Sequence, residues 1–154
     1  MKNTALALFL ISGAVNASDN NYSNAQKSFF CAATLNEING AEMAMARLNN
    51  QSEDQISINA KPKFQQIDHY INYATEQMNI YYSEKNLGAV TVSDIATSYA
   101  SSISFVSILP DYPGPETQLH YVTRKLTWHM DKYSRQGCET IANASKNSDE
   151  KEVK

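Results

Sequence analysis

The sequence lacks the short motifs that identify most enzymes and metal proteins. It contains no H-E-x-x-H or C-x-x-C spacing, and no Glu-x-x-His repeat of the kind that holds two metal ions in helical bundles. It also contains no P-loop, no dinucleotide-binding glycine pattern and no nucleophile elbow. We therefore expect a protein without catalytic activity or cofactor, and we assign no catalytic or metal-binding residue.

Positive charge and long apolar runs are also scarce. The 154 residues include 13 lysines and arginines against 16 acidic residues, a net charge of −3, and the basic residues form no cluster. Nucleic acid and anionic membrane surfaces are recognised mainly by clustered cations, so neither is an expected partner. No segment has the roughly 20 consecutive apolar residues of a membrane helix. We therefore expect no membrane span.

The first 17 residues are typical of a secretory signal peptide. Lys2 precedes an apolar run at residues 5–11, and Val15 and Ala17 are the small residues of a cleavage site. We expect cleavage after Ala17, a single helical domain at residues 18–144 and a disordered charged tail at 145–154. The protein is expected to be exported, to a bacterial periplasm in the first place and otherwise by secretion.

Two cysteines remain in the exported chain, Cys31 near its beginning and Cys138 near its end. Oxidising compartments favour disulfides, so we expect these two to be paired. A link between such distant residues would stabilise the fold by roughly 4–5 kcal/mol, because it restricts the unfolded chain.

Helical periodicity dominates the rest of the chain and predicts an all-α fold, an antiparallel bundle of about four helices. The predicted helices cover residues 22–49, 62–85, 93–109 and 115–144. A polar loop at 49–61 and a proline-rich connection at 109–116 separate them. The disulfide would join the first helix to the last.

Spacing along two of these helices predicts which residues face the core. In the second helix they are Phe64, Ile67, Ile71, Ala74, Met78 and Tyr82. In the fourth they are Leu119, Val122, Leu126, Met130, Tyr133 and Ile141.

Trp128, the only tryptophan, projects away from the predicted core face of the fourth helix, on one stripe with Tyr121. Three interpretations compete: another part of the chain covers this stripe, the stripe binds a protein, or it binds an aromatic or anionic ligand. Tryptophan, tyrosine and arginine are enriched where proteins bind one another. We therefore predict a partner-binding surface for another protein or a second copy of this chain, formed by Tyr121, Arg124, Lys125, Trp128, Lys132 and Arg135.

Histidine offers little metal chemistry, because His120 and His129 are nine residues apart and point to opposite sides of their helix. One alternative is a carrier or sensor of a small ligand such as haem, held between the helices by Met43 or Met45 and His129. No C-x-x-C-H motif is present for covalent haem attachment. The leading hypothesis is a protein-binding function, as in an envelope inhibitor, an immunity protein or an accessory subunit.

Overall fold

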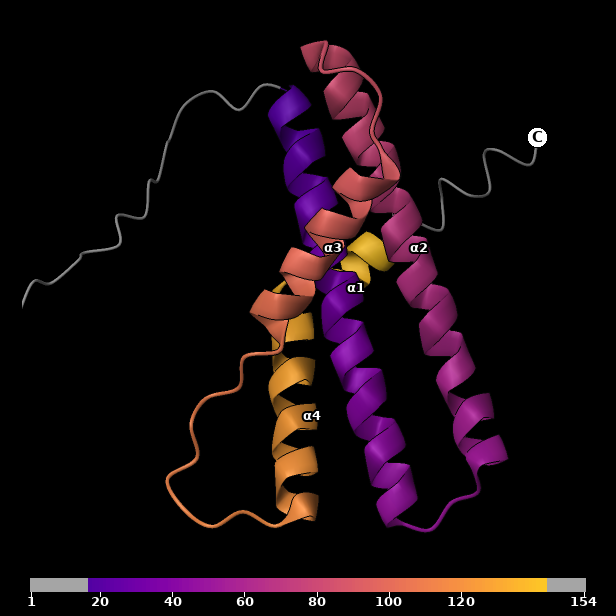
Figure 1. Ribbon diagram of the computed structural model, residues 1–154, viewed down its shortest axis with the longest axis vertical. Helices are drawn as coiled ribbons and strands as arrows, with labels where there is room; N and C mark the ends of the chain where they lie inside the picture. Colours follow the sequence, from indigo (N-terminus) through magenta and orange to yellow (C-terminus); the bar gives the residue numbers. More distant parts are fainter. Residues whose placement is uncertain (1–16, 144–154) are drawn as a thin grey trace, which may run out of the picture.

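The computed structural model describes residues 17–143, which form four long helices and a short final one (Figure 1). The expected all-α bundle and the expected disulfide between its first and last helices are confirmed. The predicted tail at 145–154 and all of the predicted signal peptide except Ala17 lie outside the described residues. The helices are α1 (Ala17–Leu48), α2 (Glu53–Lys85), α3 (Val92–Val106), α4 (Gln118–Arg135) and a last one at 138–143.

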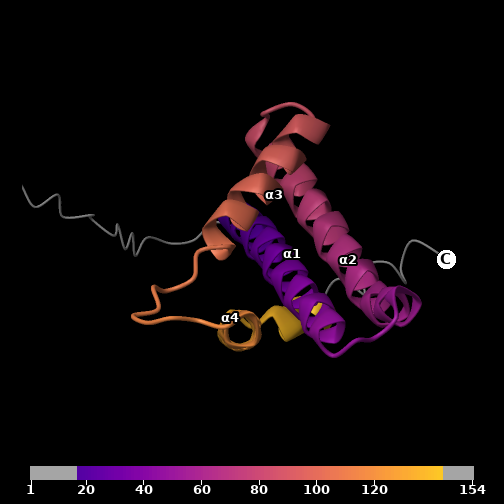
Figure 2. The same ribbon diagram turned by 60° about the horizontal axis from the view of Figure 1, so that its bottom comes forward.

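Helix α1 is the centre of the molecule. Helices α2, α3 and α4 each make their main contacts with α1. In two views α1 lies between α4 on one side and α2 on the other, and α3 crosses its N-terminal half (Figures 1 and 2). Helix α1 therefore contacts each of the other three long helices, and α4 packs mainly against α1.

Helix α2 begins earlier than its sequence pattern predicts, so the loop expected at residues 49–61 is largely helical. Ser52 caps the helix by accepting a hydrogen bond from the backbone N–H of Gln55, and two acidic residues follow it in the first turn. Only Ile56 and Ala60 of this added segment are buried, which explains its weak periodicity. Pro62, the predicted first residue of the helix, instead lies inside it.

The remaining boundaries also differ from the expected ones. Thr91 and Asp94 form a reciprocal capping box at the start of α3, so this helix begins at Val92, one residue before its predicted start. Thr117 caps α4 by accepting a hydrogen bond from the His120 backbone. The predicted single helix at 115–144 is interrupted at Gly137, which adopts a positive φ of 67° that favours glycine.

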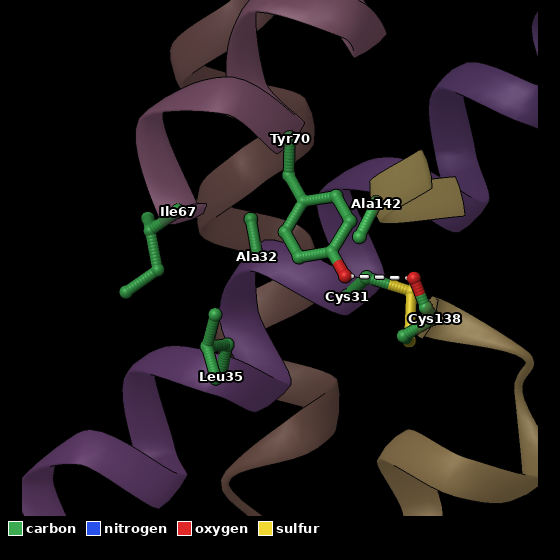
Figure 3. Close-up of a cluster of buried hydrophobic side chains, with 7 residues drawn as sticks. All are labelled: Cys31, Ala32, Leu35, Ile67, Tyr70, Cys138 and Ala142. Atoms are coloured by element: carbon green, nitrogen blue, oxygen red, sulfur yellow. Dashed lines mark hydrogen bonds between the residues drawn. A yellow bond between two sulfur atoms is a disulfide. The ribbon is translucent and has the colours of Figure 1, made fainter. Parts of the chain in front are cut away.

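A buried polar cluster joins α1, α2 and the last helix. The Tyr70 hydroxyl donates to the Cys138 carbonyl at 2.7 Å, beside the Cys31–Cys138 disulfide (Figure 3). Because the Tyr70 hydroxyl proton is used in this bond, the Tyr133 hydroxyl must donate to the Tyr70 oxygen. The Gln66 amide in turn donates to the Tyr133 hydroxyl at 3.0 Å. Each hydroxyl is thus satisfied inside the core, and the network fixes how α2 and α4 sit on α1.

Three residues predicted to face the core are exposed instead: Phe64 in α2, and Leu119 and Met130 in α4. In α2 the fully buried ring belongs to Tyr70, since the helix meets the disulfide on that side. In α4 the buried side chains are Val122 and His129. The buried face of α4 is therefore turned toward His129 and away from Met130.

Removal of the disulfide tests its contribution to the fold. The double substitution Cys31→Ala and Cys138→Ala is expected to lower the free energy of unfolding by about 4 kcal/mol, because the bridge closes a segment with a sequence separation of 107. Urea denaturation followed by circular dichroism measures this change. Reductant should shift the midpoint of the native protein and leave that of the variant unchanged. Equal midpoints for the oxidised native protein and the variant would contradict the prediction.

Candidate protein-binding surface

Lys125, one of the predicted surface cations, faces α1 and is not available to a partner. Its ammonium contacts the Glu37 carboxylate at 2.5 Å, and both side chains are largely shielded from solvent. Ser107 donates to the other carboxylate oxygen of Glu37 at 2.9 Å. Burial opposes the ionisation of Glu37, but the hydrogen bonds from Lys125 and Ser107 outweigh it and lower its pKa. Lys125 therefore fastens α4 to α1.

Arg124 organises the connection between α3 and α4. Its guanidinium donates twice to the Glu116 carboxylate, at 2.9 Å each, and once to the Pro110 carbonyl at 2.8 Å. It also lies 5.4 Å from the ring centre of Tyr112 and 5.9 Å from that of Tyr121. A guanidinium is planar and charged, so it can pair with a carboxylate through two hydrogen bonds and also lie close to aromatic rings. Arg124 therefore holds two aromatic side chains in place.

Trp128 and Lys132 form a second aromatic–cation group one turn further along α4. The Lys132 ammonium lies 5.2 Å from the Trp128 ring centre and 5.8 Å from that of Phe105 in α3. It also donates to the Val106 carbonyl at 3.4 Å. Trp128 is partly buried, and its enclosed indole N–H has no hydrogen-bond acceptor in the described part of the chain. The tryptophan is thus partly covered, as the first of the three interpretations held.

Of the six predicted residues, the structure brings four into two pairs, Tyr121 with Arg124 and Trp128 with Lys132. Lys125 points to α1, and Arg135 is exposed at the end of α4, paired with Asp131 at 2.9 Å. Most of these cations already have acidic or carbonyl partners within the chain. The surface therefore offers aromatic groups more than free positive charge.

The structure adds residues that the helical pattern of α4 could not reveal. Phe105 is 64% exposed, Tyr112 is 42% exposed, and Ile108 between them is also exposed. They come from the end of α3 and the connection that Arg124 folds back onto α4. We define the aromatic surface as Phe105, Ile108, Tyr112, Tyr121 and Trp128.

His129 is fully buried against α1, and neither ring nitrogen has a hydrogen-bond partner among residues 17–143. Its pKa is lowered to about 4, chiefly by burial; Glu37 opposes this shift, and the nearby Lys125 and Lys132 add to it. The imidazole is therefore neutral at ordinary pH.

The haem alternative requires a methionine of α1 and His129 at one site. Met43 and Met45 line a cavity at the α1–α2 turn, whereas His129 does not line it. Among the described residues no group of three or more histidines, cysteines, aspartates or glutamates is placed to hold a metal ion. The two methionines thus share a cavity that His129 does not line.

Comparison with protein-family models, with curated proteins and with solved structures finds no match to this chain. Within residues 17–143, no helix combines the length and the apolar character needed to cross a membrane.

Acid should destabilise the protein through His129. The folded-state pKa of about 4 lies below the ordinary 6.5, so protons bind preferentially to the unfolded chain as the pH falls between these values. His129 then costs about 2 kcal/mol of stability at pH 5 relative to pH 7. The variant His129→Leu should lose this dependence over the same range.

The measurement is urea denaturation at several pH values between 7 and 5. His120→Leu is the matched control, since His120 is exposed at the start of α4 and should leave the decline in place. An equal decline in His129→Leu and the native protein would show that another group causes it.

Proposed function

We propose that this chain is a small exported helical protein without catalytic activity, which acts by binding another protein through the aromatic surface. The observation that supports this best is the pair of aromatic–cation groups around Arg124 and Lys132. Export is supported by the leader-like first 17 residues and by the disulfide, which suits an oxidising compartment such as the bacterial periplasm.

The composition of the aromatic surface favours a protein partner. Tyrosine and tryptophan, with arginine, contribute disproportionately to binding energy when they fill pockets of a partner. Phe105 and Ile108 add apolar area, and monomeric proteins rarely leave such groups together in water without a use. Few unpaired cations accompany them, so the partner would supply apolar pockets and hydrogen-bond acceptors for tyrosine hydroxyls more than acidic groups.

The surface is also held in one arrangement before binding. Arg124 makes three hydrogen bonds that fix the connection 107–117, and its guanidinium contacts both Tyr112 and Tyr121. Side chains that are already ordered lose less entropy when a complex forms. This suits the inhibitor, immunity or accessory roles expected from the sequence, in which a rigid surface meets a fixed target.

Capture of the partner tests the proposal, with truncations at the most exposed rings. Trp128→Ala would also remove packing, because the indole is partly buried, so Phe105→Ala with Tyr121→Ala is the better variant. Tagged native protein, recovered from its native envelope or secreted fraction, should retain a stoichiometric partner identified by mass spectrometry. The double variant should bind that partner at least about 30-fold more weakly, a loss of roughly 2 kcal/mol.

Phe64→Ala is the matched control, since Phe64 is 46% exposed on α2 and outside the aromatic surface. It should keep the partner. Equal retention by all three proteins would contradict the proposed surface. Recovery of the chain itself as the only partner, with dimerisation lost in the double variant, would identify the surface as a homodimer interface.

A further inference from the structure

A cavity of about 240 Å³ lies where α1 ends and α2 begins. The turn between these two helices is at the lower end of the molecule in Figure 1. Six of the eleven residues that line the cavity are apolar, and one of these belongs to α4. The remaining lining residues are Asn39, Glu42, Asn49, Gln51 and Asn59. The apolar residues are Met43, Met45, Ala46, Ile56, Ala60 and Leu126.

Asn39 is the notable polar residue in the wall of this cavity. It is 1% exposed, and neither its amide nitrogen nor its amide oxygen has a hydrogen-bond partner among the described residues. Buried polar groups without partners are costly and few in folded proteins, so each one calls for a physical reason. A donor and an acceptor side by side would pair with a ligand that carries an amide or a hydroxyl.

The charges around the cavity restrict the ligand further. Among the described residues, Glu42 is the one charged residue that lines it, and its carboxylate is paired with Lys63 at 2.6 Å. No lysine or arginine within residues 17–143 lines the cavity to neutralise an anion. An anionic ligand would lose hydration without gaining a cationic partner, and a cationic ligand would have to compete with Lys63 for the Glu42 carboxylate. A neutral ligand meets neither cost.

We propose that this cavity binds a small neutral molecule with an apolar body and one amide or hydroxyl group, and that Asn39 recognises that group. The site is separate from the aromatic surface and does not depend on the function proposed for it. A dry cavity of about 150 Å³ holds one benzene ring, so this cavity suits a ring or short chain with one polar substituent. Haem is far too large for it.

Methionine-methyl NMR with benzamide as the probe tests the proposal. Benzamide combines one ring with one neutral amide, and the methionines report on location. The methyl signals of Met43 and Met45 should shift with a Kd of about 1 mM or tighter. Those of Met78, buried elsewhere in α2, and of the exposed Met130 should not. Benzoate, of the same shape but charged, should bind at least about tenfold more weakly.

Two substitutions test separately whether the ligand occupies the cavity and whether the Asn39 amide recognises it. Ala46→Phe should abolish binding by occupying the space, and Ala96→Phe, at an exposed alanine of α3, should not. Asn39→Leu keeps the approximate volume and removes the unpaired amide, so it should fold and still bind toluene. It should bind benzamide at least about fivefold more weakly than the native protein does.

Three outcomes would overturn the inference. Unchanged Met43 and Met45 signals would show that the cavity does not take such a ligand. Benzoate binding as tight as benzamide would contradict the neutral ligand class. Undiminished benzamide binding in a folded Asn39→Leu variant would show that the buried amide does not recognise it.

Discussion

The position of α4 depends on its attachment to α1, and the rest of the structure depends on that attachment. The covalent part is the Cys31–Cys138 disulfide, and Tyr70 adds a hydrogen bond from α2 to the Cys138 carbonyl. Further along, Lys125 pairs with Glu37 of α1 at 2.5 Å. Ser107 donates to the other carboxylate oxygen, so neither oxygen of this shielded carboxylate is left without a partner. Together these contacts place one face of α4 against α1 and leave Tyr121 on the outside.

The same attachment brings α3 and the connection 107–117 to the aromatic surface. Ser107, just after α3, bonds to the Glu37 that holds Lys125, so the end of α3 and the middle of α4 share one anchor on α1. Lys132 then reaches the Val106 carbonyl and lies between the rings of Trp128 and Phe105. His129 is enclosed beneath this assembly as a neutral group, and its protonation would act on the packing that holds the surface together.

Periodicity and cysteine count were enough to predict the helical class, the disulfide and the existence of four long helices, because these follow from local spacing and redox chemistry. The early start of α2 was missed because only Ile56 and Ala60 are buried there, although Ser52 and Gln55 have the spacing of a helix cap. Which face of α4 is buried could not be predicted, since a helical projection does not show which other elements cover each side of the helix. Trp128 and Tyr121 were recognised on one stripe, whereas Phe105 and Tyr112 join them only through tertiary contacts to Lys132 and Arg124.

We propose that a protein partner covers the aromatic surface where the protein works. Hydroxyl-radical footprinting of aromatic side chains tests this without knowledge of the partner, by comparing the purified protein with the protein in its native compartment. If a partner covers the surface, Phe105 and Tyr121 should be oxidised several times more slowly in the native compartment, while Phe64 on α2 should be oxidised equally in both. Equal oxidation of all three residues in the two settings would contradict it.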